Sequence, residues 1–189
     1  MKEINFFKEY TRKINQIFNF SHQNLIVLNK TYEKILKIRK KNKIIFLGNG
    51  GSAAIASHVS VDLTKNAKIR SINFNESDLL TCLSNDYGYD KWMSKALEFY
   101  SLSGDLVIII SSSGESKNVI SAANWCLENN FEFITFTGNK INNSLVKRNK
   151  NGLNFWVDSK SYNMIELSHL FALLMIIDRI IGKSEYKNL

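Results

Sequence analysis

From Lys43 onward, short apolar runs alternate with segments of helical periodicity, and this alternation most limits the folds available to the chain. Five apolar runs are predicted as strands: residues 44–47, 69–74, 106–110, 133–136 and 153–157. The segments between and after them are predicted as helices: 52–64, 76–100, 115–129, 141–149 and 162–181. Strands that alternate with helices form βαβ units. We therefore predict a three-layer α/β/α fold, flavodoxin-like, with a five-stranded parallel sheet covered on both faces.

The residues before the first strand follow a different pattern. Apolar side chains recur at three- and four-residue steps from Phe7 to Ile17 and again from Leu25 to Ile38, with a polar break at 19–21. This periodicity predicts two amphipathic helices, whose apolar faces must pack on the domain or on another subunit. The length of 189 residues fits one domain, in which 1–42 form an N-terminal helical extension.

The cysteine content and the apolar segments indicate the cellular compartment of the protein. Cys82 and Cys126 are the two cysteines, and their spacing is unlike that of a metal site, which favours a reducing compartment. The first ten residues mix charges with aromatic side chains and lack the apolar core of a signal peptide. The longest apolar run, 170–177, is too short to span a membrane. We therefore expect a cytoplasmic protein without membrane contacts.

The net charge of +8 favours anionic partners such as phosphates or nucleic acid. The clearest basic cluster, residues 37–43, contains no aromatic side chain on which a base could stack, so nucleic acid is not expected as a partner. We interpret the cluster as a solvated helix end, where cations suit the helix dipole.

Ligands of parallel sheets bind outside the carboxyl ends of the strands, and two of these junctions are unusual. At the first, residues 46–53 read Phe-Leu-Gly-Asn-Gly-Gly-Ser-Ala. Glycines let the backbone approach a ligand closely, and Asn49 and Ser52 add polar groups where the next helix begins. A tight turn without a ligand is one alternative. A dinucleotide fingerprint is another, but it needs an acidic residue at the end of the second strand, so no nucleotide cofactor is expected.

At the second junction, residues 110–117 read Ile-Ser-Ser-Ser-Gly-Glu-Ser-Lys. The alternative to a binding site is a helix cap, which requires only one of the four serines. We predict that these hydroxyls and the neighbouring amides bind a phosphate group. The loop lacks the Gly-Lys-Ser/Thr ending of a P-loop, so ATP hydrolysis is not expected.

Two pairs of titratable side chains recur at helical spacing. His58 and Asp62 are four residues apart, and Glu166 and His169 are three apart, so each pair shares one face of a helix. Such pairs can bind a metal or divide acid–base work, and the alternative is a surface pair without a role. If His58 and His169 converge, two imidazoles and one or two carboxylates could bind zinc.

Three sequence blocks, residues 46–58, 84–89 and 111–119, resemble those of bacterial phosphoheptose isomerases, a branch of the sugar isomerase (SIS) domain proteins. The resemblance extends in order from about residue 43 to 178. It implies a five-stranded parallel sheet and a homotetramer with sites at the subunit interfaces. It also implies interconversion of sedoheptulose 7-phosphate and D-glycero-D-manno-heptose 7-phosphate, which is used for surface polysaccharides.

Carried over by position, the resemblance also implies residue roles. The phosphate would be bound by Ser111, Ser112, Ser113 and Ser116. The sugar would be contacted by Asn49, Gly50, Gly51, Ser52 and Asp86. His58 matches a zinc ligand of the family.

Three positions depart from the family pattern. Asp62 stands where the family has a metal-binding acid–base glutamate, and the shorter side chain retracts the carboxylate by roughly 1.5 Å. Glu166 and His169 align with a glutamine ligand and with the first of two histidines. The second, catalytic histidine aligns with Leu174, or with Leu173 after a shift of one residue.

From this pattern we hypothesise that Asp62 is the catalytic base and His169 the second acid–base group. We further hypothesise that His58, Asp62 and Glu166 bind zinc, which would polarise the substrate carbonyl. Two alternatives remain: a non-catalytic SIS module that binds a sugar phosphate or a protein partner, and an isomerase for a different phosphosugar.

Overall fold

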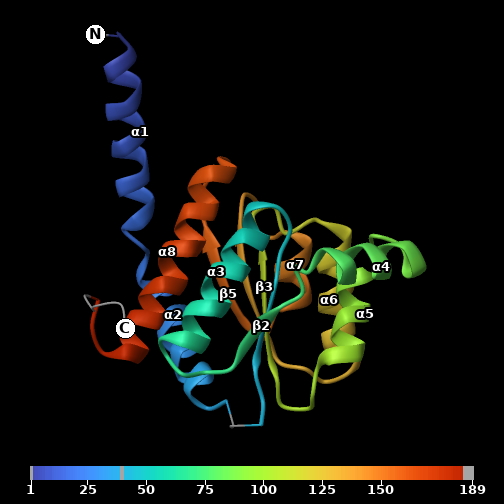
Figure 1. Cartoon of the computed structure of the whole chain (residues 1–189). Helices are drawn as coiled ribbons and strands as arrows, with labels where there is room; N and C mark the ends of the chain where they lie inside the picture. Colours follow the sequence, from blue (N-terminus) through green and yellow to red (C-terminus); the bar gives the residue numbers. More distant parts are fainter. Residues whose placement is uncertain (1, 39–40, 185–189) are drawn as a thin grey trace.

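The computed structural model describes residues 2–38 and 41–184, and it confirms the α/β fold with a five-stranded parallel sheet (Figure 1). The strands are β1 (Ile44–Leu47), β2 (Ser71–Asn73), β3 (Leu106–Ser111), β4 (Phe133–Gly138) and β5 (Leu153–Val157). Their order is β2-β1-β3-β4-β5, and every neighbouring pair is parallel. β1 and β3 are neighbours, so the two unusual loops leave the sheet side by side at its carboxyl edge.

Helices cover both faces of the sheet (Figure 1). The helices of the first face are α2 (His22–Leu36), α3 (Gly51–Lys65) and α8 (Tyr162–Ile181). Those of the second face are α4 (Ser77–Tyr87), α5 (Trp92–Tyr100), α6 (Lys117–Glu128) and α7 (Ser144–Arg148). In β3, Ile108 and Ile110 join the core under the first group, and Val107 and Ile109 join the core under the second. The strands are apolar on both sides because both sides are buried.

Two predicted elements differ from the structure. The segment 76–100 is not one helix, because α4 ends at Gly88, whose φ of +86° is rarely adopted by residues with a side chain. The predicted strand 69–74 is reduced to Ser71–Asn73. This edge strand pairs only with β1, which offers three partners, Ile44 to Phe46.

Helix α1 (Lys2–Phe18) projects beyond the sheet and its covering helices (Figure 1). Its last residue, Phe18, stacks on Phe171 of α8 with ring centroids 4.6 Å apart. The predicted break follows, and Ser21 caps α2 by accepting a hydrogen bond from the backbone N–H of Asn24 at 3.2 Å. Toward the other end of α1, Phe6 and Phe7 are 65% and 69% exposed. One end of α1 therefore packs on its own chain, and the other presents apolar side chains outward.

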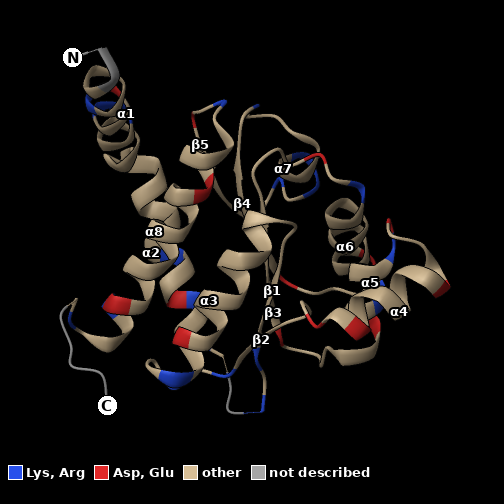
Figure 2. Cartoon of the chain, turned by 45° about the horizontal axis from the view of Figure 1, so that its top comes forward, with Lys and Arg blue, Asp and Glu red and all other residues tan. Residues whose placement is uncertain are grey.

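The described residues of the basic cluster, 37–38 and 41–43, lie at the amino edge of the sheet, where β1 begins and α3 ends, opposite the two loops (Figure 2). The first residue of the cluster, Lys37, is an exposed C-cap of α2, as expected for a solvated helix end. Its last residue, Lys43, is instead buried and paired with Asp105, so the interpretation does not hold for that end of the cluster. Residues 39–40 of the cluster lie outside the described residues. None of the helices in the described part of the chain combines the length and apolar character that a membrane span requires.

Candidate functional site

The glycine loop, residues 47–51, connects the carboxyl end of β1 to α3. Gly50 is the N-cap of α3 and has a φ of +52°, which disfavours any side chain. At Gly48 a Cβ would lie 2.7 Å from the backbone of Ser52, so only glycine fits. Ser52 itself is buried beneath the loop. The loop thus exposes backbone at the sheet edge, where a ligand can approach closely.

Asn49 joins the glycine loop to the helix that follows the neighbouring strand. Its Nδ2 donates to Oδ1 of Asn118 at 2.8 Å, and Nδ2 of Asn118 donates back to Oδ1 of Asn49 at 2.8 Å. The Tyr89 hydroxyl donates to the same Oδ1 of Asn49 at 3.3 Å. Asn118 lies in the first turn of α6 and is buried. These bonds fix the glycine loop against the helix that the serine loop enters.

The serine loop, residues 111–116, connects β3 to α6. The N–H of Gly114 donates to Oγ of Ser111 at 3.1 Å, and the N–H of Glu115 donates to Oγ of Ser113 at 3.2 Å. Gly114 has a φ of +67°, and a Cβ there would collide with the side chain of Asn143. Two of the four serine hydroxyls therefore hold the loop in its own shape.

The hydroxyls of Ser112 and Ser116 are not used in this way. Within the described residues, Oγ of Ser112 is buried without a hydrogen-bond partner, and the side chain of Ser116, the N-cap of α6, makes no capping bond. An unpaired buried hydroxyl costs about 1–3 kcal/mol, so the Ser112 hydroxyl is available to a partner from outside the chain, either water or a ligand. Of the first amides of α6, that of Val119 donates to Oδ1 of Asn118 at 3.0 Å, and the helix dipole favours an anion beside the amides that precede it.

His58 and Asp62 come together on α3, with Nε2 of His58 3.3 Å from Oδ2 of Asp62. Asn66 also donates to Oδ1 of Asp62, at 3.2 Å. Burial, and next the charge of Asp62, raise the pKa of Asp178 on α8. At 1.5 Å per residue, Asp62 lies about 16 Å along α3 from Gly51. The pair therefore forms as predicted but stands well down the helix from the glycine loop.

His169 does not reach the sheet edge. It is completely buried, and its Nε2 donates to the carbonyl oxygen of Thr137 at 3.1 Å. Its ring packs edge-on against Phe136 and Phe155. Burial lowers its pKa to about 4, against the opposing effect of the Thr137 bond. The burial of His169 within one chain does not favour a role as the second acid–base group, which stays a prediction.

Comparison with known proteins agrees with the loops. SIS domain models match residues 5–138 and 100–178. The phosphoheptose isomerase of Thermodesulfovibrio yellowstonii is 33% identical over 140 residues, which cover 70% of this chain and 70% of that protein. The probable phosphoheptose isomerase of Thermoplasma acidophilum is 35% identical over 164 residues, which cover 79% and 88%. This chain belongs to the phosphoheptose isomerase family of SIS domain proteins.

A solved family member has the same architecture. The phosphoheptose isomerase GmhA from Neisseria gonorrhoeae superposes with a TM-score of 0.82 at 25% sequence identity. The superposition covers 95% of this chain and 97% of that one. The family likeness therefore includes the N-terminal helices as well as the sheet.

The zinc site that the phosphoheptose isomerase resemblance implies does not form within one chain. The carboxylate of Glu166 lies against Gly51, where a Cβ would collide with it. His58 lies about 10 Å further along α3, on the rise of 1.5 Å per residue. Among the described residues, no three His, Cys, Asp or Glu side chains are placed to share a metal ion. The donors of one chain therefore do not fit zinc.

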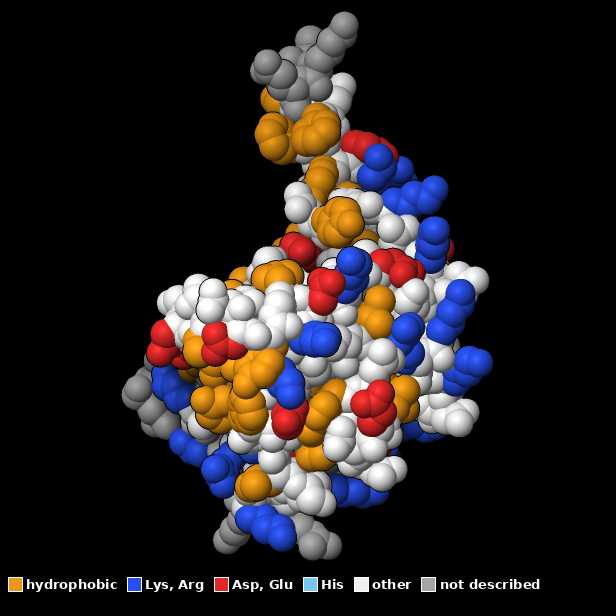
Figure 3. All heavy atoms as spheres, turned by 90° about the vertical axis from the view of Figure 1, so that its right-hand side faces the viewer, with side chains coloured by type: hydrophobic (Ala, Val, Ile, Leu, Met, Phe, Trp, Pro, Cys, Tyr) orange, Lys and Arg blue, Asp and Glu red, His pale blue; other side chains and the backbone are white. Residues whose placement is uncertain are grey.

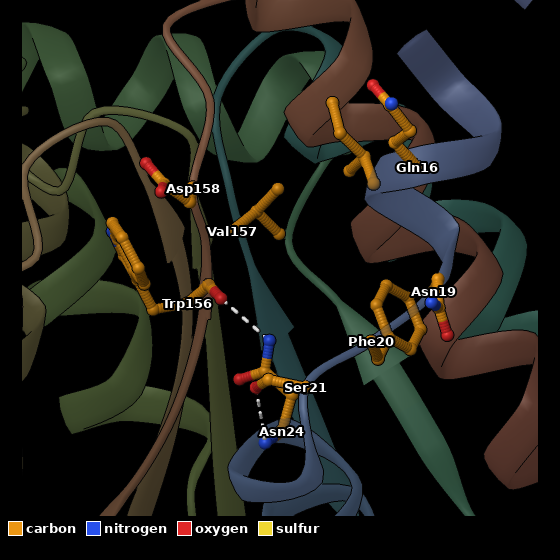
Figure 4. Close-up of a pocket in the computed structure, with 9 residues that line it drawn as sticks. Gln16, Asn19, Phe20, Ser21, Asn24, Trp156, Val157 and Asp158 are labelled. Carbon is orange, nitrogen blue, oxygen red and sulfur yellow. Dashed lines mark hydrogen bonds between the residues drawn. The ribbon is translucent and has the colours of Figure 1, made fainter. Parts of the chain in front are cut away.

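Two cavities lie near the carboxyl edge, and neither is lined by the serine loop. One, of about 330 Å³, is lined by Gly51 and Glu166 together with parts of α1 and α8. The other, of about 490 Å³, lies between the α1–α2 link and the end of β5 (Figure 4). There Asn24 donates to the carbonyl oxygen of Trp156 at 2.8 Å, and none of the predicted site residues lines the cavity. A phosphate needs no enclosed cavity, because convergent N–H and O–H groups at a helix start suffice to bind it.

Asp86 lies on the exposed side of α4, where it accepts a hydrogen bond from Nδ2 of Asn85 at 3.0 Å. The residues that follow Asp86 in the chain, Tyr89 and Asp90, contact the glycine loop and the first residue of α6. Tyr89 bonds the glycine loop, and the Nζ of Lys117 lies 3.5 Å from Oδ2 of Asp90. Asp86 itself contacts neither loop in the described chain, so its role as a sugar contact stays a prediction.

Asn118 and Tyr89, which connect the two loops, are not among the site residues predicted from the sequence. Both belong to the blocks that carry the family resemblance, 111–119 and 84–89. Their place in these blocks was the one sequence feature that pointed to a role. Helical periodicity alone shows Asn118 only as a polar residue near the start of a helix.

Proposed function

We propose that this chain is a phosphosugar aldose–ketose isomerase. Its proposed reaction converts sedoheptulose 7-phosphate to D-glycero-D-manno-heptose 7-phosphate in the cytoplasm, for surface polysaccharide synthesis. The observation that carries the proposal is the reciprocal bond of Asn49 and Asn118, which joins the glycine loop to the phosphate-binding end of α6. Membership of the phosphoheptose isomerase family supports the choice of substrate.

The two loops divide the binding work. The hydroxyls of Ser112 and Ser116 bind the phosphate together with the first amides of α6, since both hydroxyls are left without a capping or other hydrogen bond in the described chain. The backbone of Gly50 and Gly51 accommodates the sugar, because it carries no side chain that would keep a hydroxyl-rich ligand away. Lys117, at the first position of α6, adds positive charge beside the phosphate.

We also propose that the active form is a homotetramer in which α1 packs on other copies. Ile4, Phe6 and Phe7 are mostly exposed on a helix that projects from the domain, and Figure 3 shows hydrophobic side chains on this projection. Light scattering is expected to give a tetramer for the native chain and smaller species for Phe6→Glu/Phe7→Glu. A monomeric native chain would refute the tetramer without bearing on the loops.

A second candidate function rests on Leu174. It aligns with the catalytic histidine of the family and packs against the core under α3 and α8. Leucine cannot transfer a proton. A sugar-phosphate-binding module without turnover would explain intact loops beside this substitution.

Turnover separates the two candidates. The native chain is expected to form the aldose from sedoheptulose 7-phosphate, and to act less on ribulose 5-phosphate and fructose 6-phosphate. Ser112→Ala/Ser116→Ala is expected to raise KM at least tenfold, about 1.4 kcal/mol of binding. Ser121→Ala is the control, because Ser121 lies on the same helix and bonds Ser94 on α5. Binding without turnover would favour the module, and neither binding nor turnover would refute both candidates.

A further inference from the structure

Glu166 is the carboxylate that touches the glycine loop. A Cβ at Gly51 would collide with both carboxylate oxygens of Glu166, so these oxygens lie directly against the first residue of α3. Within the described residues, Glu166 makes no hydrogen bond and no ion pair. Its carboxylate is therefore free to act on a ligand that the glycine loop accommodates.

The cavity beside Glu166 has room for part of a sugar. It measures about 330 Å³, and Glu166 shares its lining with Tyr10, Asn163 and the apolar side chains of Ile55 and Leu170. Apolar walls with a few polar groups are typical of small-molecule sites. A carboxylate in such a wall can accept a carbon-bound proton from the ligand, because no hydrogen-bond donor of the described chain occupies its oxygens.

The other acid–base candidates are worse placed within one chain. His169 is sealed in the core and bonded to Thr137. Asp62 is paired with His58 and Asn66, and it lies about eleven residues beyond the loop on α3, close to three helical turns. Neither can reach a sugar accommodated at Gly50 and Gly51 without leaving its partners.

We infer that Glu166 is the catalytic base of the proposed isomerisation. This inference rests on the proposed function. The carboxylate removes a proton from C1 of the ketose, the C–H electrons form the C1=C2 bond, and the carbonyl oxygen O2 takes a proton from water to give a 1,2-enediol. The carboxylic acid then returns its proton to C2 while O1 loses its proton to water and C1=O1 forms. The carboxylate is regenerated, and no oxidant or reductant is consumed.

The test follows both half-reactions in D2O. Sedoheptulose 7-phosphate is incubated with each variant, and NMR records deuterium entry at C1 and appearance of the aldose. Glu166→Gln is expected to lower both rates at least a hundredfold while the dissociation constant changes less than threefold, a loss in kcat rather than KM. Glu166→Asp is expected to retain part of the activity, because it keeps the base at a shorter reach. Glu128→Gln, an exposed residue at the end of α6, is the matched control.

The outcomes distinguish the inference from the function on which it rests. If Glu166→Gln keeps native exchange and turnover, Glu166 is not the base, and the isomerase proposal stands. If Glu166→Gln keeps native exchange and turnover while Asp62→Asn loses both, Asp62 is the base instead. If the native chain binds the substrate but neither exchanges its C1 proton nor forms aldose, both the base and the isomerase activity are refuted, and the binding module remains.

Discussion

Asn49 and Asn118 exchange two amide hydrogen bonds of 2.8 Å, and through them the loop after β1 is fixed to the first turn of the helix after β3. Each amide is donor and acceptor at once, so the pair is satisfied without water. Because both residues follow adjacent parallel strands, the pair sets the distance between the proposed sugar and phosphate subsites.

Breaking this pair is expected to weaken substrate binding as well as the fold. Asn118→Ala removes the two hydrogen bonds of the pair and the one that Oδ1 of Asn118 accepts from the N–H of Val119, each worth about 0.5–1.5 kcal/mol. The free energy of unfolding is expected to fall by about 1.5–4.5 kcal/mol, and KM for the sugar phosphate is expected to rise about tenfold as the glycine loop loosens. Asn124→Ala, on the same helix but bonded to Arg148, serves as control. Equal KM in both variants would show that the pair does not position the loops.

Ser112 is expected to show opposite effects on stability and on binding. Its hydroxyl is buried without a partner in the described chain, so Ser112→Ala removes a desolvation cost and leaves the free energy of unfolding equal or higher. The same change is expected to weaken phosphate binding several-fold, because the ligand loses a hydroxyl partner. Urea unfolding and calorimetric titration measure the two quantities. A clear loss of stability in Ser112→Ala would mean that the hydroxyl serves the fold.

His169 is expected to make the protein acid-sensitive. In the unfolded chain its pKa returns to 6.5, whereas burial holds it at about 4 in the folded chain. The unfolded state therefore binds a proton first as the pH falls from 6.5 toward 4, and stability is lost across that window. Between pH 7 and pH 5 the loss is about 2 kcal/mol from this residue.

The comparison uses His169→Gln, which can still donate to Thr137 and does not titrate. Urea unfolding at pH 7 and pH 5 is expected to show about 2 kcal/mol less pH dependence in the variant than in the native chain. Identical pH dependence in the two chains would contradict a neutral, buried imidazole.

Asp105 is expected to be a large single contributor to stability. It is buried and accepts hydrogen bonds from the N–H and Nζ of Lys43, from Asn42 and from the N–H of Leu102. Burial raises the pKa of Asp105, and these bonds together outweigh it and lower the pKa. Asp105→Ala leaves Lys43 unpaired and is expected to cost about 3–5 kcal/mol.

Two further variants serve as controls for the effect of Asp105→Ala on stability. Lys43→Met/Asp105→Leu is expected to be more stable than Asp105→Ala alone, because no buried charge is left behind. Glu98→Ala removes an exposed ion pair with Lys95 and is expected to cost less than about 1 kcal/mol. If the double variant is as unstable as Asp105→Ala, charge burial is not the cause.

The sheet and its two loops were predictable from the sequence for a physical reason. A strand buried on both faces is a short apolar run, and the residues that leave its carboxyl end are free to be glycines and serines. Residues 106–110 and 110–117 can therefore be predicted as a strand and a binding loop from their local sequence alone. The break at Gly88 was not predicted, because one glycine within a helical pattern is often tolerated.

The surroundings of the candidate acid–base residues could not be predicted, because the spacing of two residues shows that they share a helix face but not what that face packs against. Glu166 and His169 are about 60° apart around α8 at 3.6 residues per turn. That difference is enough to turn Glu166 toward Gly51 and His169 toward the sheet. Helix α8 is apolar on most sides, so its sequence does not mark the buried face. Likewise the spacing of His58 and Asp62 predicts their contact but not their distance from the loops.

The most direct test of the central claim is a crystal structure of the native chain with sedoheptulose 7-phosphate. The phosphate is expected at hydrogen-bond distance, about 2.7–3.2 Å, from the hydroxyls of Ser112 and Ser116 and the first amides of α6, with the sugar over Gly50 and Gly51. A phosphate bound instead in the cavity at the end of β5, or among the basic residues at the amino edge, would contradict it.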